Sequence, residues 1–130
     1  MIRALLVDDH PAILWAVRRL LEQGSNVEVV GEARDGEEAI RELGRLKVDV
    51  VVLDIYMPKT DGFGVMRALA RMPASPKVVV LSSNGSPGVK ERIMAAGADA
   101  FVAKRNAFKE LLPAIRAVIS RGQDVATQAE

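Results

Sequence analysis

Five short apolar runs recur along the 130 residues of this chain, and they limit the folds that it can adopt. The runs are Ile2–Val7, Val27–Gly31, Val48–Leu53, Val78–Leu81 and Ala100–Val102. Their starts lie roughly 20 to 30 residues apart, which is the length of one strand followed by one helix. Several runs are continuous rather than alternating, as in ALLV, VDVVVL and KVVVL. Strands covered on both faces have this pattern, so the runs predict a parallel sheet between two layers of helices.

The segments between the runs have the periodicity of amphipathic helices. The apolar residues that share one face of the first segment are Ile13, Val17, Leu20 and Leu21. Asp35 and Asp61 each precede a later segment, where their carboxylates are predicted to cap free amide groups. Gly97 follows another segment and is predicted to end that helix in the left-handed conformation. These signals together predict one sheet with alternating strands and helices, the (βα)5 pattern.

The last helical segment carries an apolar stripe that proline interrupts. The stripe consists of Phe108, Leu111, Leu112, Ile115, Val118 and Ile119. Pro113 lacks an amide donor, so we expect the helix to begin near residues 108–110, with Pro113 close to its first turn. Residues 122–130 are polar and aperiodic, and we expect them to fray as a tail or the start of a linker after a domain of residues 1–121.

Composition narrows the class of protein further. The length suits one domain with its own core, and the 49% apolar and 4% aromatic content favours an α/β domain over an aromatic-rich sandwich. A net charge of +1 gives no sign of bulk attraction to nucleic acid or membrane, and the lack of cysteine excludes disulfides and thiolate chemistry. The N-terminal run is too short for a signal peptide or a membrane span, so we expect a soluble, cytoplasmic protein.

Acidic residues stand where strands are predicted to end. Asp8 and Asp9 close the first strand and Asp54 closes the third, and these ends are neighbours in a doubly wound sheet. Three carboxylates in one pocket repel one another unless a hard cation binds, and Mg²⁺ suits oxygen ligands. Ser82 ends the fourth strand and Lys104 follows the fifth. The set predicts a site for a phosphoryl group, held by Mg²⁺, lysine and serine, with one aspartate as its covalent acceptor.

The motifs that carry these residues resemble those of response-regulator receiver domains. They are VDDHP at 7–11, LDIYMPKTDG at 53–62, LSSN at 81–84 and GADAFVAK at 97–104. The similarity covers roughly residues 2–121 and implies a flavodoxin-like three-layer sandwich with strand order 2-1-3-4-5. The DHP start and Arg105, where many receivers have proline, resemble the subfamily whose receivers precede LuxR-type helix-turn-helix domains.

The resemblance also assigns roles to single residues. It implies that Asp54 accepts phosphate from a histidine kinase or a histidine phosphotransfer protein, and that Ser82 and Lys104 hold the phosphoryl oxygens. Asp9, Asp54 and the backbone carbonyl of Tyr56 would bind Mg²⁺, with Asp8 acting mostly through water. Phe101 would be the aromatic switch residue, although its periodicity alone fits a core position equally well.

Three residues near the acceptor suggest how long the phosphorylated state lasts. Tyr56, two residues past Asp54, is bulkier than many residues found there, and Ser83 stands where alanine is usual in the family. Asn84, on the opposite rim, offers a way to position water for hydrolysis. We therefore expect Tyr56, Ser83 and Asn84 to tune the lifetime of the phosphate.

Two residues outside the motif roles have alternative interpretations. His10 follows the acidic pair and could act as a ligand or a base. We favour the alternative that it is a residue at the start of a helix, directly before Pro11. Trp15 points about 160° from the apolar stripe at 100° per residue. Leu14 and Trp15 are therefore expected to form an exposed pair that contacts a partner, with local packing as the alternative.

Three classes of function compete for this sequence. The leading hypothesis is a phosphorylation-controlled switch in two-component transcription regulation, with a homodimer expected on phosphorylation and DNA contacted only through a separate output domain. An Mg²⁺-dependent aspartyl phosphatase would need a second aspartate where Tyr56 stands, so turnover as an enzyme is not expected. A degenerate receiver that acts as a phosphorylation-independent interaction module is the remaining alternative.

Overall fold

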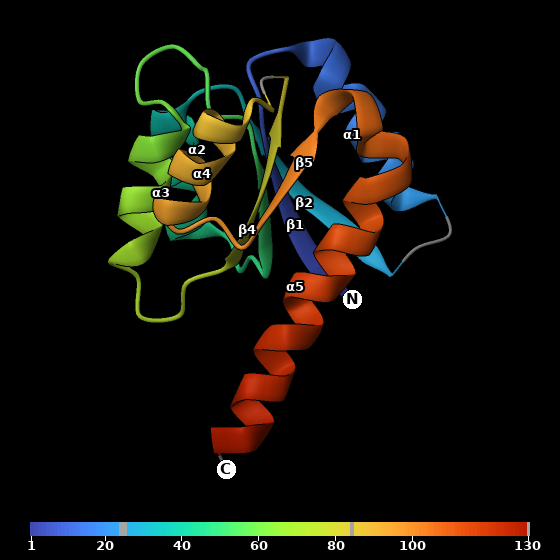
Figure 1. The fold of residues 1–130 in the computed structure, drawn as a ribbon, viewed down its shortest axis with the longest axis vertical. Helices are drawn as coiled ribbons and strands as arrows, with labels where there is room; N and C mark the ends of the chain where they lie inside the picture. Colours follow the sequence, from blue (N-terminus) through green and yellow to red (C-terminus); the bar gives the residue numbers. More distant parts are fainter. Residues whose placement is uncertain (24–25, 84, 130) are drawn as a thin grey trace.

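The computed structural model describes residues 1–23, 26–83 and 85–129, with side chains described as far as residue 122. Within these residues five parallel strands alternate with five α-helices (Figure 1). The elements are β1 (Ile2–Val7), α1 (Pro11–Glu22), β2 (Val27–Ala33), α2 (Gly36–Arg45), β3 (Val50–Leu53), α3 (Gly62–Ala70), β4 (Lys77–Ser82), α4 (Pro87–Ala95), β5 (Ala100–Ala103), the 3-10 turn η1 (Lys104–Asn106) and α5 (Ala107–Ala129). The strand order is β2-β1-β3-β4-β5, which confirms the predicted doubly wound α/β fold.

Two apolar layers sandwich the sheet, which explains the continuous apolar runs. Along β1, Ala4 and Leu6 pack into the layer beneath α1 and α5, whereas Leu5 and Val7 pack into the layer beneath α2, α3 and α4. The same division of the helices between the two faces is visible in Figure 1. Because both faces of the strand are covered, every position in it favours an apolar side chain.

The predicted helix ends are confirmed by local hydrogen bonds. The Asp35 carboxylate accepts a bond from the Glu38 amide at 2.8 Å, and that of Asp61 accepts one from the Gly64 amide at 3.0 Å. Each bond satisfies an amide group that has no partner within the helix. Gly97 follows α4 with φ of +113°, a conformation that favours glycine because it has no Cβ.

Gly62 brings the start of α3 against the end of β3. A Cβ atom at this position would lie 2.7 Å from the Asp54 carbonyl oxygen and 2.6 Å from Ile55 Cα. Both neighbours are backbone atoms that cannot rotate away, so any side chain at residue 62 would displace the chain that follows Asp54. The Asp61–Gly62 pair therefore caps a helix and also sets the position of Asp54.

The structure corrects three expectations for α1 and α5. Leu14 is 3% exposed and packs in the core, so it does not form an exposed pair with Trp15, which is 64% exposed. Phe108 is 83% exposed and lies outside the apolar stripe, since α5 begins at Ala107, before the position that Pro113 indicated. Pro113 lies inside the helix, where its exposed position leaves the carbonyl one turn earlier accessible to water.

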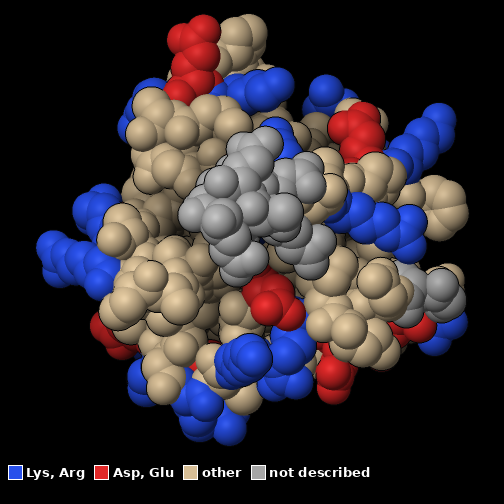
Figure 2. All heavy atoms as spheres, turned by 90° about the horizontal axis from the view of Figure 1, so that it is seen from below, with Lys and Arg blue, Asp and Glu red and all other residues tan. Residues whose placement is uncertain are grey.

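The helix α5 runs on to Ala129, where a fraying tail was expected. Its last turns project beyond the sheet (Figure 1). On the face from which α5 projects, acidic and basic side chains are mixed around the rim (Figure 2). Among the helices that the structure describes, none has the length and apolar content needed to cross a bilayer.

Candidate functional site

The carboxyl edge of the sheet brings the candidate residues together. Strands β1 and β3 pair so that Val7 lies opposite Leu53, which makes Asp8 and Asp54 neighbours at the ends of these strands. The Asp54 amide donates a hydrogen bond of 2.9 Å to the Val7 carbonyl, which extends the ladder to the acidic residue itself. Strands β4 and β5 pair so that Ser82 lies opposite Ala103, the residue before Lys104.

Lys104 joins two of the acidic residues through its ammonium group. Its Nζ lies 2.9 Å from Asp8 Oδ2 and 3.6 Å from Asp54 Oδ2. The side chains of Asp8, Asp54 and Lys104 are largely buried, so water screens these contacts less than it would at the surface. These distances place the Lys104 ammonium beside the two carboxylates of the pocket.

Asp54 has an unfavourable environment for its negative charge. Burial raises the pKa of its carboxyl group, and the nearby charge of Asp8 raises that pKa further. The Lys104 ammonium and the backbone amides of Tyr56 and Ile55 lower the pKa and only partly oppose the rise. A cation that binds between these carboxylates would relieve the repulsion that raises the pKa.

Asp9 has an oxygen atom that suits a cation. Its Oδ1 is buried and has no hydrogen-bond partner among the described residues. Ligand atoms of Asp8, Asp9, His10 and Asp54 all lie within 4.8 Å of one another. The neighbouring contact of Asp9 Oδ1 is His10 Nδ1 at 3.1 Å, which makes no hydrogen bond to it, and a carboxylate oxygen of this kind is a hard ligand that Mg²⁺ binds well. The residues present therefore fit the divalent cation that the acidic motif predicts.

His10 takes a larger part in this cluster than the sequence indicated. It does stand at the N-cap of α1, yet its Nδ1 atom lies 2.8 Å from Asp8 Oδ1 and 3.1 Å from Asp9 Oδ1. The hydrogen bond to Asp8 and the negative charges of both aspartates raise the pKa of His10. Its place directly after two acidic residues and before Pro11 was the signal in the sequence, but only the folded chain shows which way the ring turns.

The remaining candidates lie around the pocket. Ser82 is fully buried at the end of β4, whereas Ser83 is exposed, and Asn84 lies outside the described residues. Tyr56 is 52% exposed and follows Asp54 by two residues. Phe101 is partly buried on β5, and a Cβ atom on Gly85 would lie 3.5 Å from its ring. The aromatic ring therefore lies close to Gly85, in the loop that follows Ser82.

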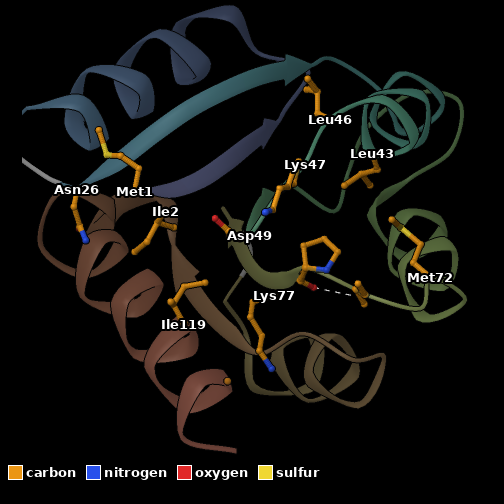
Figure 3. A pocket seen from close by; sticks show the side chains of 15 residues that line it. Met1, Ile2, Asn26, Leu43, Leu46, Lys47, Asp49, Met72, Lys77 and Ile119 are labelled. Atoms are coloured by element: carbon orange, nitrogen blue, oxygen red, sulfur yellow. Dashed lines mark hydrogen bonds between the residues drawn. The ribbon is translucent and has the colours of Figure 1, made fainter. Parts of the chain in front are cut away.

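A hollow lies elsewhere among the described residues, at the amino ends of the strands (Figure 3). It has a volume of about 740 Å³ and includes Lys47, Asp49 and Lys77. The Asp49 carboxylate already accepts a hydrogen bond of 2.8 Å from the Arg3 amide, so it has a structural role at the edge of the sheet. This hollow brings together no set of groups comparable to the acidic pocket.

Comparison with known proteins identifies relatives of the chain. Residues 4–116 match the response regulator receiver domain family. The response regulator UvrY of Escherichia coli K12 is 37% identical over 127 residues, which are 98% of this chain and 58% of UvrY. A LuxR-family two-component response regulator from Aurantimonas sp. SI85-9A1 superposes with a TM-score of 0.85 at 28% identity, over 98% of this chain and 96% of that one. The RcsB response regulator of Salmonella typhimurium, in a structure described for DNA interaction, superposes with a TM-score of 0.82 at 30% identity. The match covers 93% of this chain and 60% of that one.

Proposed function

This chain belongs to the response regulator receiver domain family, and on that basis we propose that it accepts a phosphoryl group on Asp54. Receiver domains act in two-component signalling, and the relatives of this chain include transcriptional regulators of the LuxR type. One observation carries the assignment to Asp54. Its carboxyl group lies beside a second carboxylate and 3.6 Å from the Lys104 ammonium, at the edge of the sheet where strands end.

The roles of the surrounding residues follow from the chemistry of the transfer. An Asp54 carboxylate oxygen attacks phosphorus, the P–N bond of a phosphohistidine breaks, and the imidazole nitrogen leaves with the bonding electrons and takes up a proton. Lys104 and Ser82 hold the oxygens of the transferred group. Asp9, Asp54 and the carbonyl of Tyr56 would hold Mg²⁺, and Asp8 would act through water. When bound, the ion neutralises negative charge on the phosphoryl oxygens.

The partners of this exchange are a sensor histidine kinase or a histidine phosphotransfer protein. The chain spans 58% of the length of UvrY. The activity that a whole regulator has beyond its receiver domain is therefore proposed for this protein. We place the receiver at residues 1–121, with the following residues leading toward an output domain that binds DNA. RcsB, which is described as interacting with DNA, supports this arrangement. Phosphorylation would then act through contacts between proteins, including a homodimer.

Treatment with a small phosphodonor tests the proposal. The full chain is incubated with acetyl phosphate and Mg²⁺ and its intact mass is measured. A single added phosphoryl group is the expected result for a receiver. Release of inorganic phosphate with no phosphorylated chain detected in the intact mass would indicate a phosphatase instead. An unchanged mass without phosphate release would indicate an interaction module that does not depend on phosphorylation.

The lifetime of the phosphorylated state should depend on Tyr56. Hydrolysis needs a water molecule in line with the scissile P–O bond, and a large ring next to Asp54 obstructs that line. We expect Tyr56→Ala to lose phosphate up to about tenfold faster, which corresponds to about 1.4 kcal/mol in the barrier. Decay of the phosphorylated mass after removal of the donor measures the rate. Tyr56→Phe is the matched control and should retain the long lifetime, and slower decay in Tyr56→Ala would show that the ring promotes hydrolysis.

Ser82 should couple phosphorylation to Phe101. The phosphoryl group offers the Ser82 hydroxyl a new charged acceptor, and Gly85, in the loop that follows Ser82, lies close to the ring of Phe101. A charge-assisted hydrogen bond contributes roughly 1.5–3 kcal/mol, enough to shift a two-state population by about tenfold or more. Ser82→Ala should accept phosphate yet lose most of the NMR shift changes around Phe101. Ser83→Ala is the control, and identical shift changes in Ser82→Ala and wild type would refute the coupling.

A surface of α1 and α5 is proposed to contact a partner. We define it by Trp15 and Phe108, because the buried Leu14 takes no part. A hollow of about 180 Å³ between the two helices includes Leu20 and Phe108, so Phe108 borders an apolar depression, whereas Trp15 lies on α1 outside that hollow. Large exposed aromatic side chains are enriched at the centres of interfaces.

Fluorescence tests this surface directly, because Trp15 is the only tryptophan in the sequence. In dilute monomer its emission should be that of a ring in water, with a blue shift when the partner or a second phosphorylated copy binds. Trp15→Ser should weaken that association while changing the free energy of unfolding by less than about 0.5 kcal/mol. The emission of a buried ring in the dilute monomer would contradict the proposal.

A further inference from the structure

The loop that joins β3 to α3 carries the residues directly after Asp54, and its backbone has an uncommon conformation. We call residues 55–61 the acceptor loop. Within it Lys59 has a φ of 60°, in the left-handed region that residues other than glycine rarely adopt. Among the described residues it is the one position other than glycine with a positive φ. Such a conformation persists only where surrounding contacts impose it.

The residue after Lys59 supplies close contacts of this kind, because Thr60 lies between two glycines. A Cβ atom on Gly36, at the start of α2, would overlap the Thr60 carbonyl oxygen and would lie 2.7 Å from Thr60 Cβ. A Cβ atom on Gly64, in α3, would overlap Thr60 Cγ2. Thr60 is therefore wedged between two helices that lie side by side on one face of the sheet (Figure 1).

Two further contacts close the acceptor loop. The Lys59 ammonium lies 3.7 Å from Asp35 Oδ2, and the other oxygen of that carboxylate caps α2. The Gly62 amide donates a hydrogen bond of 2.8 Å to the Ile55 carbonyl, which joins the two ends of the loop. The ion pair is partly exposed, so water screens it and it contributes little by itself. The close packing of Thr60 is thus the contact that fixes the loop against both helices.

The start of the acceptor loop lies at the candidate site. Burial raises the pKa of Asp54, and hydrogen bonds from the Tyr56 and Ile55 amides to its carboxyl group oppose that rise. The Tyr56 carbonyl belongs to the cation ligands proposed above. A loop that shifts at Thr60 therefore moves the amides at Asp54 and a ligand of the cation together.

We propose that Thr60 is a positioning residue of this site, which holds the acceptor loop so that the Tyr56 carbonyl keeps its place relative to Asp54. Its backbone packs against Gly36, and its Cγ2 methyl group packs against Gly64. The inference rests on the proposed receiver function for the presence of the cation. The methyl group carries the role rather than the hydroxyl, because Cγ2 fills the space that a side chain on Gly64 would occupy.

Two substitutions of Thr60 separate the methyl group from the hydroxyl. Thr60→Ser removes the methyl group, and Thr60→Val keeps it and removes the hydroxyl. The full chain is incubated with acetyl phosphate, and the rate of mass gain is measured as MgCl₂ is varied. In Thr60→Ser the Mg²⁺ concentration for half-maximal uptake should rise by about tenfold, as for other residues that orient metal ligands, and Thr60→Val should match wild type. A partly unfolded chain would lower the maximal uptake instead.

Two glycines of α2 provide a matched pair for the backbone contact. Gly36→Ala places a methyl group against the Thr60 carbonyl and should also raise the half-maximal Mg²⁺ concentration by about tenfold or more. Gly44→Ala makes the same change in the same helix, where a Cβ atom would meet nothing within 4 Å. It should keep the wild-type Mg²⁺ requirement and raise the melting temperature by about 2–6 °C, because alanine favours a helix.

Amide hydrogen exchange in EDTA examines the loop without any cation. The Gly62 amide reports on closure of the loop, because it bonds to the Ile55 carbonyl. Its exchange in Thr60→Ser should be about tenfold faster than in wild type and in Thr60→Val, since the loop opens locally. The amide of Val51, in the core of β3, should exchange as in wild type, which distinguishes a local opening from a weaker fold.

The outcomes separate this inference from the proposed function. Either a wild-type Mg²⁺ requirement or a wild-type exchange rate of the Gly62 amide in Thr60→Ser would overturn the role of Thr60. Equal losses in Thr60→Ser and Thr60→Val would also overturn it, because the methyl contact would not be their cause. A wild-type chain that takes up no phosphate at any MgCl₂ concentration would instead count against the proposed receiver function. The exchange of the Gly62 amide would then decide whether Thr60 holds the loop.

Discussion

Asp54→Asn is expected to abolish phosphoryl uptake from acetyl phosphate. The substitution keeps the shape of the side chain but removes the anionic oxygen that attacks phosphorus. The neighbouring Asp8 cannot readily replace it, because the Asp8 carboxylate is held by Lys104 at 2.9 Å and by the His10 amide at 2.9 Å. Intact mass should show one added phosphoryl group in wild type and none in the variant. Glu28→Gln, which removes an exposed carboxylate on β2, is the control and should be phosphorylated normally.

The same variant should unfold at a higher temperature in the absence of Mg²⁺. Burial and the charge of Asp8 raise the pKa of Asp54 in the folded protein, so the folded state binds this proton more tightly than the unfolded chain. The stabilisation from that proton is complete below the unfolded pKa and is lost as pH rises through the folded pKa. Once the carboxyl ionises, its charge therefore destabilises the fold, and asparagine removes that cost. Thermal unfolding in EDTA checks this, and it also shows that a variant without uptake is folded.

Each of these two expectations for Asp54 has a result that would contradict it. Wild-type levels of phosphorylation in Asp54→Asn would show that another residue accepts the phosphate. A lower unfolding temperature in EDTA would show that the Asp54 carboxylate stabilises the pocket, against the direction of its pKa. Peptide mapping of the phosphorylated wild-type chain after reduction of the acyl phosphate gives an independent location for the modified residue.

Removal of Mg²⁺ should have the second largest effect. A bound dication stabilises developing charge on the phosphoryl oxygens by several kcal/mol, so uptake in EDTA should be about a hundredfold slower or more. Asp9→Asn should weaken Mg²⁺ binding and phosphoryl uptake together, because the buried Asp9 Oδ1 is available to the cation. The rate of mass gain and a Mg²⁺ titration by calorimetry provide the two measurements.

The control for Asp9→Asn is again Glu28→Gln, which changes the net charge equally at a site outside the pocket. Its Mg²⁺ affinity should match that of wild type. Uptake that continues unchanged in EDTA would refute the requirement for the cation. A loss of uptake in Asp9→Asn with normal Mg²⁺ affinity would instead limit Asp9 to positioning Asp54 or the phosphodonor.

The sequence by itself determined the architecture, because the signals for it are local. Continuous apolar runs predict strands covered on both faces, and the caps Asp35, Asp61 and Gly97 lie next to the helix ends that they define. The site residues could be predicted for the same reason. Asp8, Asp54, Ser82 and Lys104 stand at or just after predicted strands, and parallel strands place all such ends on one edge of the sheet.

The exposure of single residues was decided by the tertiary structure. Leucine and phenylalanine occur both in cores and on surfaces. Whether Leu14 and Phe108 are buried depends on how α1 and α5 are rotated against the sheet. Helical periodicity fixes relative directions along one helix, but it does not fix which direction faces the core. The start of α5 depended likewise on η1, the 3-10 turn of Lys104–Asn106. The helix begins directly after this turn, at Ala107, which is before the position that Pro113 indicated.

The direction of the His10 ring was also outside the reach of the sequence. The pattern VDDHP predicts that an imidazole stands near two carboxylates, but adjacent side chains can point to opposite sides of a turn. Closure of β1 against β3, together with the bond from the His10 amide to Asp8, turns the ring toward the pocket. Local pattern therefore determined which residues gather at this edge of the sheet, and contacts between distant segments decided which atoms meet there, because those contacts form only when the whole domain is packed.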